Sequence, residues 1–174
     1  SWLISARRSY LDLIVGAIGT GAVPEYSDIQ GKVVYDISPA HKVSLLGISG
    51  FDHIDIKPED DGDEDDFVIQ DIDQHVLGGS WRWLWSRKGY ANTSIAVTYA
   101  DFSTVADDGD TRRRLFENTS QEREVTLRSS LQYTPVQGNS ISAGVIARRI
   151  FSDFTIFADA DTNRIGEHIP ALRI

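Results

Sequence analysis

The chain has 174 residues with no cysteine and no methionine, and its formal net charge is −9. The missing cysteines exclude a disulfide framework and thiolate metal sites, and the absence of a basic patch argues against nucleic acid as a partner. No run of about 18 apolar residues occurs, so no transmembrane helix is predicted. Because the chain opens on the strand-like Trp2-Leu3-Ile4 without an initiating methionine, we expect it to be an internal fragment of a longer protein.

Seven strand-like segments follow one another, and the period-two alternation of apolar and polar residues favours strands over helices. The predicted strands cover residues 2–9, 27–37, 42–54, 74–87, 92–105, 115–133 and 139–157. Long connections alternate with short turns; the long ones cover 10–26, 55–73 and 106–114, and the short ones 38–41, 88–91 and 134–138. In an up-and-down sheet this alternation places all short turns at one end, which is the arrangement of outer-membrane β-barrels.

The predicted strands have one apolar and one polar face. Trp81, Trp83 and Trp85, for example, alternate with Arg82 and Leu84. The strands run past ten residues, which exceeds the average of about 5–6 in soluble sheets and meets the length of about 9–11 that a membrane-spanning strand needs. We therefore predict an all-β fold, an up-and-down antiparallel meander of about seven long strands that forms a segment of a transmembrane β-barrel. Residues 1–174 form a single partial barrel domain.

Aromatic residues on the apolar face lie near the strand ends. Tyr35, Trp85 and Tyr133 precede short turns, whereas Phe51 and Tyr99 lie toward the long loops. Tyr and Trp prefer the boundary between lipid and water, because their rings are apolar and their polar groups reach the headgroups. These five residues are the candidate membrane aromatic girdle.

Most of the negative charge lies in one loop. Nine acids and one lysine between residues 57 and 73 account for eight of the nine net charges. Asp61, Asp63 and Asp65 are weak candidates for calcium binding, but the spacing does not fit an EF-hand, and a block of like charges is more often solvated. We predict no metal site and no cofactor. The four histidines are scattered and no nucleophile motif occurs, so we predict a protein that is not an enzyme.

Residues 2–56 resemble the early barrel strands of TonB-dependent receptors. The similar elements are the strand end Arg7-Arg8-Ser9-Tyr10, the entry Pro24-Glu25-Tyr26-Ser27-Asp28, and the hairpin Lys32-Val33-Val34-Tyr35-Asp36-Ile37-Ser38-Pro39 with the Gly47-bearing strand after it. The resemblance implies the bacterial outer membrane and a large barrel of about 22 strands that is plugged by a separate N-terminal domain. Such receptors take up iron chelates of the siderophore type, cobalamin or glycans with energy from the TonB complex.

The resemblance also implies partners for the two faces. The apolar face would meet outer-membrane lipid, and the open sheet edges would meet the remainder of the barrel. The plug domain would be a further partner, and the TonB complex would act through an N-terminal region that this sequence lacks. A small-molecule ligand would pass through the barrel. The candidates for facing the lumen or plug are Arg7, Asp28, Gln30, Lys32, Arg82, Glu124 and Arg128. A solvated lumen wall with internal ion pairs is the simplest role for them, and substrate selection is the alternative.

Two other classes of protein fit the same pattern. A soluble all-β ligand-binding module, for example for glycans, would bury the face that carries Trp81, Trp83 and Trp85. A small outer-membrane barrel without a transport function would need an eighth strand, whereas residues 161–170 read as a loop.

Overall fold

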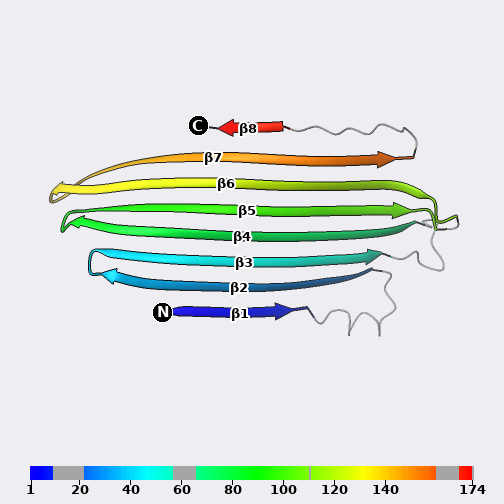
Figure 1. Cartoon of the computed structure of the whole chain (residues 1–174), viewed down its shortest axis with the longest axis horizontal. Helices are drawn as coiled ribbons and strands as arrows, with labels where there is room; N and C mark the ends of the chain where they lie inside the picture. Colours follow the sequence, from blue (N-terminus) through cyan, green and yellow to red (C-terminus); the bar gives the residue numbers. More distant parts are fainter. Residues whose placement is uncertain (10–21, 57–65, 110, 160–168, 174) are drawn as a thin grey trace.

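The computed structural model describes residues 1–9, 22–56, 66–109, 111–159 and 169–173. They form one antiparallel sheet in which the strands lie side by side in chain order (Figure 1). The strands are β1 (Trp2–Arg8), β2 (Ala22–Ser38), β3 (His41–Ile56), β4 (Phe67–Ser86), β5 (Gly89–Asp107), β6 (Arg114–Val136), β7 (Asn139–Ala158) and β8 (Ile169–Arg173). The predicted all-β, up-and-down antiparallel meander is therefore confirmed.

Several strands are longer than the sequence pattern predicts. β2 begins at Ala22 rather than at residue 27, and β4 begins at Phe67 rather than at residue 74. The first residues of β4 carry acids that break the apolar alternation. They extend the strand nonetheless, because they pair with β3 on one side and β5 on the other. Continuous pairing satisfies the backbone groups, which outweighs the low strand propensity of aspartate.

The C-terminal tail differs from the expectation. Residues 161–170 read as a loop in the sequence, but Ile169 and Pro170 belong to β8, which pairs with β7 over Arg148–Ser152. Five residues without a clear alternation give too little pattern for a strand to be recognised. β1 and β8 lie at opposite edges of the sheet, so the sheet is not closed (Figure 1).

All three tight hairpins lie at one end of the sheet, as predicted (Figure 1). They connect β2 to β3, β4 to β5, and β6 to β7, and each has a register shift beside its turn. Gly138 takes a φ of 88° in the last of them, a left-handed conformation that glycine adopts without a steric penalty. The other end of the sheet carries the long connections.

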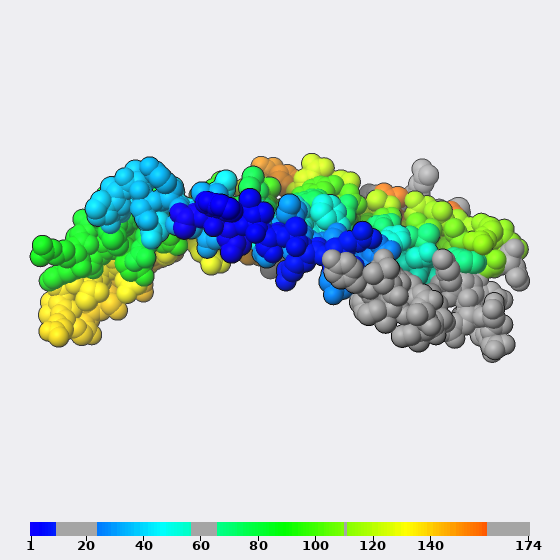
Figure 2. All heavy atoms as spheres, turned by 90° about the horizontal axis from the view of Figure 1, so that it is seen from below, coloured from blue at the N-terminus to red at the C-terminus, as the bar shows by residue number. Residues whose placement is uncertain are grey.

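The sheet is a single layer. Figure 2 shows it edge-on as a thin, bowed sheet, and no second layer of described residues covers either face. Among the described residues only Ser9, Gly89 and Ala100 are buried. The described part of the chain contains no helix long and apolar enough to cross a membrane. The described residues therefore form no hydrophobic core of the kind that two packed layers enclose.

Candidate functional site

The strand register divides the side chains into two faces. Val33, Leu45, Ile95 and Leu127 are joined through successive cross-strand pairs and lie on one side, which we call the apolar face. The same pairing extends to Trp2 on β1. Residues one position along each strand lie on the opposite side, because side chains alternate across a sheet. That side is called the polar face.

The apolar face exposes large hydrophobic side chains along its whole width. Val33, Leu45 and Ile95 are each more than half exposed, and Leu127 is 44% exposed. Soluble monomers rarely expose a contiguous apolar patch larger than a few hundred Å². An exposed apolar face of this size is typical of a surface that lipid or another protein covers.

Aromatic rings cluster on the apolar face near the short turns. The rings of Trp85 and Tyr133 lie 5.0 Å apart, and those of Trp81 and Trp83 are stacked at 5.9 Å with an interplanar angle of 3°. His41 lies against both tryptophan rings of that stack. Tyr35, which is 65% exposed, lies on the same face.

A second aromatic group lies on this face toward the long loops. Phe51 meets His75 edge-on at 5.5 Å, and His75 stacks on Tyr99 at 6.0 Å. The structure thus brings Phe51 and Tyr99 into one group with His75 between them. His75 gives no signal in the sequence, because its role depends on the register between β3, β4 and β5.

The two aromatic groups are parallel diagonals across the sheet. Successive cross-strand partners connect Tyr35 on β2 to Ser129 on β6, four strands away. Tyr133 lies on β6 four residues beyond Ser129, toward the short turns. In the same way, cross-strand partners connect Phe51 on β3 to Asp101 on β5, and Tyr99 lies two residues from Asp101 in the same direction. The rise along a strand is about 3.3 Å per residue, and neighbouring strands lie about 4.8 Å apart. Each diagonal therefore makes an angle of about 35° with the cross-strand rows, which run perpendicular to the strands. Strands of outer-membrane barrels are tilted by about 35–45°.

All seven residues predicted to face a lumen lie together on the polar face. Arg7 is the cross-strand partner of Asp28, and Gln30 is joined to Glu124 through successive cross-strand partners. The same alternation of side chains places Lys32, Arg82 and Arg128 on this face as well. Within this set the structure forms one ion pair, between Arg7 and Asp28, and it does not gather the seven residues into one cluster. The Arg7 Nε atom lies 2.9 Å from the Asp28 carboxylate.

Two residues that the sequence pattern missed complete this polar face. Arg148 on β7 lies 3.2 Å from Glu124, whose carboxylate also accepts a hydrogen bond from Thr126 at 2.6 Å. The guanidinium of Arg82 lies over the ring of Tyr90, 5.1 Å from its centroid. Only the register could have identified these partners. The polar face thus carries cross-strand ion pairs, including Arg7–Asp28 and Arg148–Glu124, together with further exposed charged side chains.

The ends of the strands near the long loops carry further ion pairs. His53 Nδ1 lies 2.6 Å from an Asp71 carboxylate oxygen, and this hydrogen bond raises the pKa of His53 above its ordinary value. Arg114 contacts both Asp107 and Glu117. Among the described residues, no group of three or more histidine, aspartate or glutamate side chains is placed to hold a metal ion. Asp61 and Asp63, like Asp65, lie outside the described residues.

Comparison of the chain with protein-family models, curated proteins and solved structures gives no match. The resemblance of residues 2–56 to TonB-dependent receptors stays a prediction.

Proposed function

We propose that this chain is a barrel segment of a TonB-dependent outer-membrane receptor that takes up a siderophore, cobalamin or glycan-type ligand. The observation that carries the proposal is the parallel pair of aromatic diagonals on the apolar face. They bound a band of exposed aliphatic side chains, and their slope of about 35° matches the strand tilt of such barrels.

The single-layer architecture supports a membrane location. Strands of 16 to 23 residues, from β3 to β6, exceed the length needed to span a bilayer. Between the two diagonals one face presents mostly aliphatic side chains, whereas the other carries charged side chains, some of them in cross-strand ion pairs. A barrel wall combines these properties, because lipid covers its outer face and water or a plug fills its interior.

The polar face supports a lumen wall. Arg7–Asp28 and Glu124–Arg148 each neutralise charge across neighbouring strands, and exposed donors and acceptors remain for water, a plug domain or a passing ligand. In the proposed protein the remaining strands and the plug complete the barrel beyond β1 and β8. The TonB complex supplies the energy for transport.

A soluble glycan-binding module is the second candidate. The parallel, stacked rings of Trp81 and Trp83 are each more than two-fifths exposed, and they offer an aromatic face on which a sugar ring could stack. This function leaves the rest of the apolar face uncovered, so the receptor segment accounts for more of the surface.

Fractionation of the bacterial envelope separates these functions. For the receptor, the full-length protein carrying this chain is expected in the outer-membrane fraction, extracted by detergent but not by salt or alkali. A deletion strain should lose energy-dependent uptake of one labelled ligand from a panel of ferric siderophores, cobalamin and oligosaccharides. Recovery in the soluble fraction with retention on a glycan matrix would favour the second candidate.

A further inference from the structure

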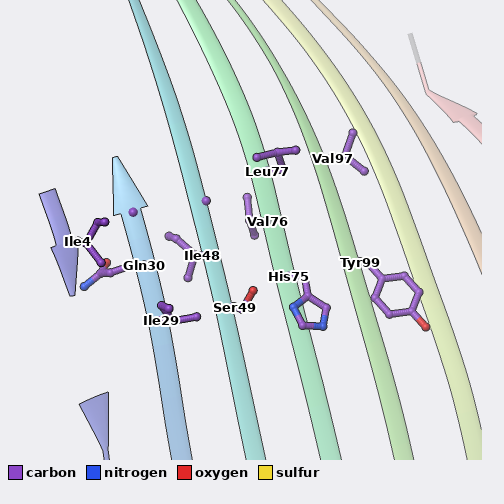
Figure 3. A pocket seen from close by; sticks show the side chains of 12 residues that line it. Ile4, Ile29, Gln30, Ile48, Ser49, His75, Val76, Leu77, Val97 and Tyr99 are labelled. Carbon is purple, nitrogen blue, oxygen red and sulfur yellow. The ribbon is translucent and has the colours of Figure 1, made fainter. Parts of the chain in front are cut away.

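A hollow of about 590 Å³ lies in the middle of the apolar face (Figure 3). Ile4 and Ile29 line it on one side, and Leu77 and Val97 line it on the other. Its floor is formed by β2 and β3, where Gly31 and Gly47 face each other as a cross-strand pair. The hollow is open, and among the described residues no side chain fills it.

The two glycines are not required by the fold of the sheet itself. A Cβ atom added at Gly31 would meet nothing nearer than 3.9 Å, and one added at Gly47 nothing nearer than 4.0 Å. Glycine inside a strand costs roughly 0.5–1 kcal/mol relative to alanine. Glycine there often marks a place where a ligand approaches the backbone closely. The space that this pair leaves is therefore available to whatever covers the apolar face.

One end of the hollow is polar. Ser49, His75, Tyr99 and Arg123 are successive cross-strand partners, and they form one row of hydrogen-bonding side chains across the apolar face. The row lies on the long-loop side of Gly47 and Leu77. Figure 3 shows Ser49, His75 and Tyr99 along this side of the hollow.

Two arginines extend this polar end. The guanidinium of Arg123 lies 5.8 Å from the Tyr99 ring centroid, and that of Arg149 on the next strand lies 4.6 Å from the Phe151 ring centroid. Neither forms an ion pair with an acid in the described part of the chain. Asp101, one row nearer the long loops, already accepts hydrogen bonds from Tyr99 and Gln121. Asp101 keeps its negative charge but forms no ion pair with either arginine, so both guanidinium groups remain available as cations next to the polar end of the hollow.

We propose that the hollow is a binding site for one phosphate-bearing membrane lipid. An acyl chain fills the space over Gly31 and Gly47, and the phosphate binds at the row of His75 and Arg123, with Arg149 as a second cation. Charge-assisted hydrogen bonds from arginine to phosphate are among the strongest in proteins. This inference rests on the proposed membrane location and adds to it a defined lipid at a defined place.

The test uses the full-length protein that carries this chain, reconstituted in vesicles of equal parts phosphatidylglycerol and digalactosyl diacylglycerol, a lipid without phosphate. Native mass spectrometry after gentle detergent release counts the lipid retained. We expect one phosphatidylglycerol per protein, preferred at least about tenfold over the galactolipid. Inorganic phosphate should not displace it, since it lacks the acyl chain.

Matched variants locate the site. Gly47→Leu fills the hollow and Arg123→Gln removes the charge, so each is expected to lower lipid retention about tenfold or more. Gly79→Leu adds the same side chain to the same face outside the hollow, where a Cβ atom meets nothing nearer than 3.9 Å, and should retain the lipid. The strand content, measured by circular dichroism, shows whether each variant folds. If Gly47→Leu does not fold, the lipid retained by Arg123→Gln tests the site alone.

The outcomes separate the two proposals. A membrane-inserted protein that retains no lipid, or retains it equally in Gly47→Leu and Gly79→Leu, overturns the lipid site alone. Retention of both lipids in equal amounts overturns the assignment of the phosphate. A protein that stays in solution and never enters the vesicles overturns the membrane location as well.

Discussion

The indole ring of Trp85 packs directly over the Cα atom of Gly89 and reaches the ring of Tyr133, with ring centroids 5.0 Å apart. Gly89 is the cross-strand partner of Tyr133. The aromatic ring thus covers a residue that has no side chain of its own. This contact holds the turn between β4 and β5 against β6.

Replacement of Gly89 by alanine should disturb this contact. An added Cβ atom would overlap the Trp85 ring, so the ring must move away from Tyr133. Overpacking of this kind costs about 1–3 kcal/mol. The expected result is a lower unfolding midpoint in denaturant and a shifted Trp emission maximum. Gly50→Ala is the control, because no atom lies within 4 Å of its added Cβ atom, and its stability should be unchanged or higher.

The aromatic diagonal near the short turns predicts the depth of the tryptophans. Trp81, Trp83 and Trp85 should lie near one lipid boundary. In vesicles, proteins that retain one of these tryptophans, with the others changed to phenylalanine, should be quenched more by lipids brominated near the headgroup than by lipids brominated near the chain end. Equal quenching by both lipids, or no quenching at all, would contradict this depth.

The sequence predicts the sheet better than it predicts the contacts. Period-two alternation and turn spacing identify seven strands and their two faces, because both signals are local. The strand start at Phe67 is hidden, since Asp71 and Asp73 break the alternation and only pairing with β3 and β5 extends the strand. The roles of His75 and Arg148 depend likewise on register, which joins residues far apart in the chain.

A double-mutant cycle on Glu124 and Arg148 tests the charge balance of the polar face. Their side-chain atoms lie 3.2 Å apart, and both are about a third exposed or more. The coupling free energy is therefore expected to be modest, about 0.2–1 kcal/mol. It is measured from the unfolding free energies of Glu124→Gln, Arg148→Gln and the double variant. Zero coupling at low salt would show that the pair makes no net contribution.

The His53–Asp71 pair predicts a pH-dependent stability. The hydrogen bond to Asp71 raises the pKa of His53 above 6.5 in the folded chain. Its stabilisation is therefore fully present below about pH 6.5, the unfolded value, and is lost as the pH rises through the raised folded value. Both side chains are about half exposed, so the loss should stay below about 1 kcal/mol.

The measurement for this pair is the histidine ring titration by NMR together with the unfolding midpoint between about pH 6 and pH 8. Asp71→Asn should return the pKa of His53 toward its ordinary value and flatten the pH dependence. A His53 pKa unchanged by Asp71→Asn would contradict the role of the hydrogen bond.

Arginine substitutions on β6 distinguish a lipid-facing surface from a solvent-facing one. Leu127→Arg places a charge in the middle of the apolar band, whereas Ser130→Arg places the same side chain on the polar face of the same strand, near the native Arg128. A charge at the bilayer midplane costs about 2–4 kcal/mol on the lipid face of a barrel. Leu127→Arg should therefore reduce the yield of membrane-inserted, protease-resistant protein, and Ser130→Arg should leave it nearly unchanged. Since Leu127 is 44% exposed, an uncovered apolar face in water would instead tolerate both arginines, and equal yields of the two variants would contradict lipid contact.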